Sequence, residues 1–182
     1  MSAQEACPEQ YLERYFSQSY YAVPIAAKRK HADDAQDDQP EDAEPIPREW
    51  QYVRMSPNKL CVIGIADQHP LLDQSRRAEI GQIASVEFAD SVKGSVIKGK
   101  GKKNSLRIAP DTKLCTIATT TGKSFTVRGA VRGLLMEWNA RLETDPGLIL
   151  RDPSQGFLAI IKPSTDDDDK ILSACSRQHP GN

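Results

Sequence analysis

The sequence predicts an all-β domain with minor helices, and three observations lead to that fold class. From Trp50 onwards the apolar residues fall into runs of at most nine residues that are rich in β-branched side chains. Turn-forming residues separate these runs, at spacings that suit a small sandwich or barrel better than alternating strands and helices. The turn Thr121-Gly122-Lys123 joins two of the runs and is typical of a β-hairpin with an exposed tip, because glycine adopts the positive φ of a tight turn.

Seven runs are predicted to be strands. They cover residues 52–55, 60–66, 80–88, 113–119, 124–127, 131–138 and 157–162. Cys61 and Cys115 lie within these runs, so we expect both thiols to fill the core as small hydrophobic groups. Gly133 is interpreted as a position where two strands approach too closely for a side chain.

Two short helices are predicted beside the strands. Residues 11–21 contain four of the five tyrosines, and Leu12, Tyr15 and Phe16 have helical spacing, which indicates an amphipathic helix that packs on the domain. The second helix is expected to begin at Asn139 as N-cap, to form its first turn over residues 140–143 and to stop at Pro146-Gly147. Residues 148–150 after it should belong to the core.

Charge is segregated along the chain, although the net charge is only -1. Residues 31–47 carry seven acids and no lysine or arginine, and they contain too few apolar residues to offset the entropy of ordering. A second acidic run, residues 166–169, follows the last predicted strand. The predicted organisation is therefore an N-terminal segment with a short helix (1–25), an acidic disordered insertion (26–48), a β domain (49–164) and a disordered acidic tail (165–182).

Several classes of function are disfavoured by what the sequence lacks. The cysteines are far apart, without C-x-x-C or histidines at zinc-finger spacing, so no metal or other cofactor is expected. No apolar run reaches the roughly 18 residues of a membrane span, and early acids argue against a signal or transit peptide, which leaves the cytosol or nucleus. His69 has no partner for catalysis at readable spacing, and no phosphate-binding loop or nucleophile elbow occurs. An enzyme is therefore not expected.

The strongest candidate for partner binding is a lysine-rich stretch. Residues 93–107 hold six basic side chains and no acid, and Gly99 and Gly101 leave the backbone free to adapt. The candidate contacts are Lys98, Lys100, Lys102 and Lys103. An acidic protein surface or a phosphate backbone would suit them, but no aromatic residue is present to stack on bases, which disfavours nucleic acid without excluding it. A soluble loop that contacts nothing is the other alternative.

Residues 131–164 (VRGLLMEWNARLETDPGLILRDPSQGFLAIIKPS) resemble the C-terminal third of the glycine-cleavage H-protein. The positions that carry this resemblance or set the fold around it are Arg132, Gly133, Glu137, Asn139, Pro146, Gly147, Leu148, Gly156 and Leu158. The stretches LERYFSQSYY, NKLCVIGIADQHPLL, IKGKGKKN, VRGLLMEWN and KPSTD make the chain most similar to the Abitram (Simiate) family, a relative of the H-protein. The acidic insertion and the details of the lysine-rich loop depart from the animal pattern.

This resemblance implies a barrel-sandwich hybrid, the biotinyl-lipoyl-like hammerhead of the H-protein, with two small sheets that face each other. It also implies a non-catalytic actin-binding protein, present in the nucleus and the cytoplasm, without membrane attachment and expected to be a monomer. Lys28-Arg29-Lys30 is compatible with a nuclear-import signal or with a plain linker.

One lysine carries the alternative function. Carriers of this fold attach lipoate to a lysine at a hairpin tip, and Lys123 occupies such a tip. Its context, Thr-Thr-Gly-Lys-Ser, lacks the glutamate of the Glu-Ser-Val-Lys-Ala type found in H-proteins. A lipoyl-type carrier modified on Lys123, an ordinary solvated turn lysine and a nuclear nucleic-acid-associated factor therefore stay open beside actin binding.

Overall fold

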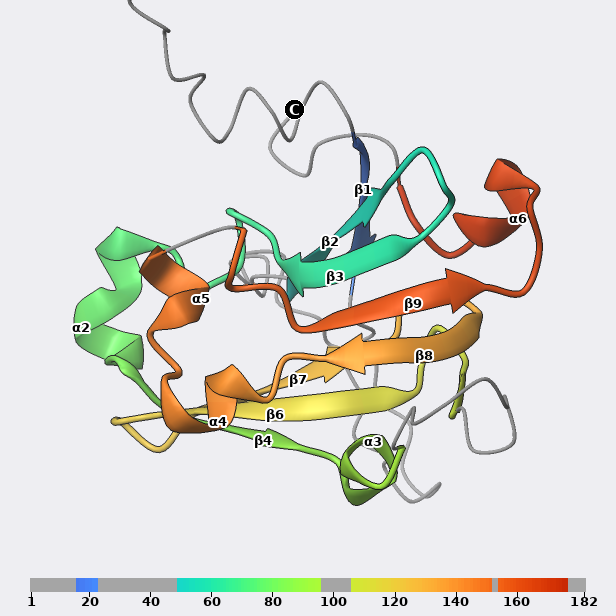
Figure 1. Ribbon diagram of the computed structural model, residues 1–182. Coiled ribbons are helices and arrows are strands. Elements are labelled where there is room, and N and C mark those ends of the chain that lie inside the picture. Colours follow the sequence, from blue (N-terminus) through green and yellow to red (C-terminus); the bar gives the residue numbers. More distant parts are fainter. Residues whose placement is uncertain (1–15, 23–48, 96–105, 152–153, 177–182) are drawn as a thin grey trace, which may run out of the picture.

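The computed structural model describes residues 16–22, 49–95, 106–151 and 154–176 (Figure 1). Within these ranges the chain forms a six-stranded sheet of order β1-β2-β3-β9-β8-β5 and a three-stranded sheet of order β4-β6-β7, and every strand pairing is antiparallel. The two sheets share one hydrophobic core. This confirms the predicted all-β class with minor helices, and the two facing layers agree with the predicted barrel-sandwich hybrid.

The predicted strands occur with ends shifted by at most three residues. The strands are β1 Ser17–Ala22, β2 Trp50–Met55, β3 Cys61–Ile65, β4 Ile83–Phe88, β5 Arg107–Ile108, β6 Lys113–Thr119, β7 Ser124–Arg128, β8 Gly133–Trp138 and β9 Ala159–Pro163. The helices are η1 Gln74–Arg76, α2 Arg77–Ile80, α3 Asp90–Lys93, α4 Arg141–Thr144, α5 Leu148–Arg151 and α6 Asp168–Ile171. The first residue of the 80–88 run ends α2 and does not begin a strand, and the two-residue β5 was not predicted at all.

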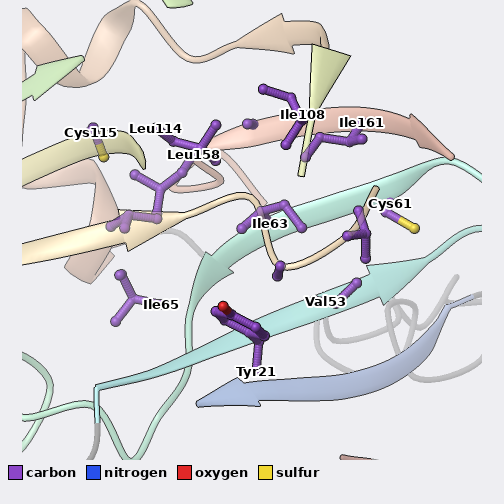
Figure 2. Close-up of a cluster of buried hydrophobic side chains, with 14 of the residues drawn as sticks. Tyr21, Val53, Cys61, Ile63, Ile65, Ile108, Leu114, Cys115, Leu158 and Ile161 are labelled. Atoms are coloured by element: carbon purple, nitrogen blue, oxygen red, sulfur yellow. The ribbon is translucent and has the colours of Figure 1, made fainter. Parts of the chain in front are cut away.

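The core is built from alternate side chains of both sheets. Ile63 and Ile161 of the larger sheet and Ile117 of the smaller one are fully buried, and Figure 2 shows part of this cluster. Cys61 and Cys115 are also 0% exposed, which confirms their predicted place in the core. Burial raises the pKa of the Cys61 thiol to about 12, so this group is protonated at neutral pH.

Gly133 marks a close approach of the two strands β8 and β9. A Cβ atom placed there would lie 2.2 Å from the carbonyl oxygen of Lys162 and 2.7 Å from Cγ2 of Ile161. No side chain fits at such distances, as the sequence predicts for this glycine. The position therefore sets the separation of the two strands.

The helix predicted over residues 11–21 is wrong where the structure describes it, because residues 17–22 form strand β1. All six residues pair with β2, in a register that places Tyr20 opposite Tyr52. Tyr20 and Tyr21 are both buried, at 8% and 4% exposure, and they belong to different hydrophobic clusters. Adjacent side chains reach opposite faces only in a strand, so pairing with β2 overrides the local helical spacing.

Asn139 does not cap the following helix, which corrects a second prediction. Helix α4 begins at Arg141 with Ala140 as N-cap and without a side-chain cap bond. The Asn139 side chain is 4% exposed, and its amide nitrogen donates to the carbonyl oxygens of Gln155 (2.7 Å) and Phe157 (2.9 Å). It therefore holds the loop before β9, because those carbonyls lie within its reach inside the domain.

Helix α4 ends before Pro146, as predicted, because a residue before proline is disfavoured in the helical conformation. The prediction that residues 148–150 all lie in the core holds only in part. They form the first three residues of α5, in which Ile149 is 8% exposed whereas Leu150 is 38% exposed. A single helical turn directs neighbouring side chains to different sides, so only part of this apolar run can reach the core.

The predicted disordered tail is wrong for residues 165–176, which pack on the domain. Ile171 and Leu172 are buried in the core, at 3% and 7% exposure. The Asp167 carboxylate caps α6 by accepting from the amides of Asp169 and Lys170. Ser176 then exchanges two backbone hydrogen bonds of 2.7 Å with Tyr20 of β1. Two apolar residues behind the acidic run thus anchor the segment, while residues 177–182 and the predicted insertion 26–48 lie outside the described residues.

Candidate binding surfaces

Lys123 lies at the exposed turn of the β6–β7 hairpin, where the sequence predicts it. The Gly122 amide donates to the Thr119 carbonyl oxygen (3.0 Å), and Gly122 has a φ of 82°. The Lys123 ammonium group forms an ion pair with the Glu79 carboxylate of α2. The hydrogen bond from Lys123 lowers the pKa of Glu79, so this carboxylate is charged at neutral pH. The tip is thus accessible, but its amine has an acidic neighbour.

The four lysines of the candidate loop, Lys98, Lys100, Lys102 and Lys103, lie outside the described residues. Both ends of their segment are described: α3 ends at Lys93, and β5 begins at Arg107. The Lys93 ammonium group is 2.7 Å from the Glu143 carboxylate of α4, so this charge is balanced within the domain. Arg107 is exposed on the edge strand of the larger sheet.

The residues predicted to determine the fold divide into three groups. Gly133, Asn139 and Gly156 are buried, while Pro146 and Gly147 form the connection between α4 and α5. Arg132 directly precedes β8 and Glu137 lies near its end; both are exposed, and no ion pair joins them among the described residues. Burial therefore explains why Gly133, Asn139 and Gly156 contribute to the fold, whereas Arg132 faces solvent.

An aromatic group on the outer face of the larger sheet was missed by the sequence analysis. Tyr20 and Tyr52 pair across β1 and β2, and the Arg54 guanidinium lies 4.2 Å from the centre of the Tyr52 ring. A Cβ at Gly64 would lie 2.2 Å from Tyr52 Cζ, so glycine lets the ring rest on β3. The alternation of Gln18, Tyr20 and Ala22 could have indicated this surface if residues 17–22 had been read as a strand.

His69 is buried between the turn after β3 and the β6–β7 hairpin. Its side chain is 2% exposed, its Nδ1 atom accepts from the Leu71 amide (3.1 Å), and its ring meets Phe125 edge-on at 5.1 Å. Burial lowers the pKa of His69 to about 3, so the imidazole is neutral at physiological pH. These contacts indicate that the His69 side chain serves in packing the domain.

The described residues contain neither a cluster of metal-binding side chains nor a membrane-spanning helix. No group of three or more histidine, cysteine, aspartate or glutamate side chains there is arranged to hold a metal ion. None of the helices described is both long and apolar enough to cross a bilayer.

Two antiparallel sheets around one shared core, with a charged side chain on an exposed hairpin turn, define the class of this protein as an all-β domain. A scan against models of known protein families matches none of them. The chain is 30% identical over 157 residues to Protein Abitram of Dictyostelium discoideum, covering 86% of this chain and 77% of the relative. The chain belongs to the Abitram family.

Animal relatives give the same family name over shorter stretches. Protein Abitram of Drosophila melanogaster is 30% identical over 66% of this chain and 55% of its own length. The human Protein Abitram is 29% identical over 66% of this chain and 67% of its own. Among solved structures, a glycine cleavage system H protein from Mycobacterium marinum shares 14% identity, with a TM-score of 0.44 over 63% of this chain and 79% of that chain. The structural likeness is too remote to support an argument.

Proposed function

We propose that this protein is a non-catalytic actin-binding protein. The supporting observation is its membership of the Abitram family, based on 30% identity across 86% of the chain. The resemblance to that family implies actin binding. The chemistry of the described core is compatible with a binding role. His69 is neutral and buried, and burial raises the pKa values of the Cys61 and Cys175 thiols to about 12, so none of these groups is poised as a base or nucleophile.

The proposed contact is the lysine-rich loop formed by Lys98, Lys100, Lys102 and Lys103. No acid lies between residues 93 and 107, so nothing within that stretch of sequence neutralises the four ammonium groups. Exposed lysines act as point charges toward an acidic protein surface, and such complementarity raises association rates and fixes the choice of partner. Lys93 is balanced by Glu143, which makes the lysines beyond it the better candidates.

Charge reversal of the loop should remove most actin binding. We expect the full chain to pellet with filamentous actin at low salt, and less so when the salt is raised from about 50 to 150 mM, because screening weakens exposed charge contacts. The variant in which Lys98, Lys100, Lys102 and Lys103 are all changed to Glu should lose most of this pelleting in a co-sedimentation assay.

A second variant tests whether reversing lysine charges elsewhere on the domain has the same effect. Lys113 and Lys162 are exposed on strands β6 and β9, and changing both to Glu reverses charge away from the loop. This control should pellet nearly as well as the parent. Equal pelleting of the parent and the loop variant would remove the loop from the proposal, and a parent that does not pellet at all would remove actin.

The proposal includes a presence in both nucleus and cytoplasm, again by similarity to the family. Lys28-Arg29-Lys30 is the candidate import signal, although it lies outside the described residues. Imaging of the tagged full chain should show both compartments. Restriction to the cytoplasm would contradict the nuclear part of the proposal and leave actin binding unaffected.

The exposed hairpin tip supports one second candidate, a lipoyl-type carrier modified on Lys123. The glutamate-free context and the ion pair with Glu79 count against it, so we expect the intact mass of the protein isolated from its host to match the unmodified chain. A lipoyl mass increment that disappears in a Lys123→Arg variant would establish the carrier instead. The arginine keeps the charge beside Glu79 and cannot form the amide.

A further inference from the structure

An open pocket of about 350 Å³ lies at the end of the larger sheet, between α6, the start of β8, the end of β9 and the turn after β5. Two cationic residues line it, Arg132 and Lys170, together with the hydroxyl-bearing residues Ser164, Thr165 and Ser173. Pro110 and Ile171 form its apolar wall. None of the acids of the neighbouring run 166–169 lines the pocket.

Backbone contacts position the lining residues in advance. The Ser164 amide donates to the Arg132 carbonyl oxygen (3.1 Å), which holds the end of β9 beside the start of β8. Helix α6 lies near this end of β9 (Figure 1) and is fixed by the buried Ile171 and by an ion pair of 2.5 Å between Lys59 and Asp168. Because the backbone segments that line the pocket are held in place, less backbone entropy is lost when a ligand binds.

The two cations differ in how their charge is balanced. Lys170 lies 3.1 Å from the Asp167 carboxylate, which also caps α6. Arg132 makes no ion pair with any residue that the structure describes. Thr165 Oγ1 already accepts from the Asp167 amide (3.2 Å), which leaves its own hydrogen to donate. The pocket thus offers a guanidinium group, a second cation and hydroxyl donors to an anion.

We propose that this pocket binds a phosphate monoester. The planar guanidinium group of Arg132 can donate two parallel hydrogen bonds to phosphate oxygens, and the hydroxyls of Ser164, Thr165 and Ser173 can donate to the others. The acidic residues 166–169 beside the pocket repel an extended polyanion such as nucleic acid, so a single compact phosphate group is favoured. The same acids limit the affinity, and we expect a Kd on the order of 1 mM.

Titration of the ¹⁵N-labelled full chain with O-phospho-L-serine tests this site by nuclear magnetic resonance. The amide signals of Arg132, Ser164, Thr165 and Ser173 should shift together and saturate, whereas L-serine at the same concentrations should leave them in place. An Arg132→Gln variant should bind about tenfold more weakly, the loss that removal of a charge-assisted hydrogen bond produces. Arg132 is exposed, so this variant should retain the spectrum of the folded domain.

Arg77→Gln is the matched control, because Arg77 is exposed on α2 and does not line the pocket. It should bind as the parent does. Glucose 6-phosphate and a phosphoserine peptide, compared at equal concentration, separate a small-molecule ligand from a phosphorylated protein partner. The absence of saturable shifts with every phosphate probe, or equal affinity of the parent and Arg132→Gln, would overturn the proposal; neither outcome bears on actin binding.

Discussion

Replacing Gln51 by leucine should lower the free energy of unfolding by about 2–6 kcal/mol. Gln51 is 1% exposed on β2, and its side chain reaches across to β7 of the other sheet. Its amide nitrogen donates to the Arg128 carbonyl oxygen and its Oε1 atom accepts from the Arg128 amide, both at 2.8 Å. Leucine keeps a similar volume but leaves two backbone groups unpaired, and each buried unpaired group costs about 1–3 kcal/mol.

Urea unfolding measures this loss, and Gln82→Leu is the control. The Gln82 side chain is exposed, so its replacement should change the stability by no more than about 0.5 kcal/mol. Hydrogen exchange of the Arg128 amide should become faster in the Gln51 variant. A stability equal to that of the parent, with unchanged exchange at Arg128, would show that the two sheets do not depend on this side chain.

Replacing Gly133 by alanine should destabilise the fold by about 3 kcal/mol, the upper part of the range for overpacked sites. The new Cβ would meet the Lys162 carbonyl oxygen at 2.2 Å, and a strand backbone cannot yield as a flexible side chain does. The strands β8 and β9 would have to separate at Gly133 and Pro163, which form a pair of their register. Urea unfolding measures the effect. The dependence of the unfolding free energy on urea concentration should be compared with that of the parent.

Gly94→Ala controls for the loss of a glycine as such. Gly94 has a helical φ of −72°, and the only atom that its added Cβ would meet is the Asp90 carbonyl oxygen at 3.2 Å. Alanine there should change the stability by less than about 1 kcal/mol, because it also restricts the unfolded chain. Similar losses at Gly94 and Gly133 would mean that the close approach of β8 and β9 is not the cause.

The strand positions and the β6–β7 hairpin could be predicted from the sequence because their signals are local. Alternating or β-branched runs such as 113–119 and a glycine at position 122 describe neighbouring residues, whatever lies elsewhere in the fold. The burial of Cys61 and Cys115 follows from the same runs. The four lysines of the candidate loop could likewise be named from composition, but their position is outside the described residues.

The candidate pocket could not be predicted in this way. In the sequence, Arg132 belongs to a motif of residues 131–164, whereas the acidic composition before Lys170 predicts a disordered tail. They line one pocket because β9 returns beside β8 and because Ile171 and Leu172 bury α6 against the core. No local pattern joins residues 132 and 170, so only the packed chain brings these two charges together.

By itself the sequence determined the all-β class, most strand positions and the exposed lysine of the hairpin, because periodicity and turn chemistry act over a few residues. The tertiary structure alone decided that residues 17–22 form a strand, that Asn139 holds a loop, and that the acidic segment after β9 packs on the domain. Strand β1 forms because it pairs with β2, which is distant in sequence. Asn139 bonds to the carbonyl oxygen of Gln155, and Ile171 is buried only because the core is assembled. Hydrogen bonds and burial with such partners are worth more than the local preference that they override.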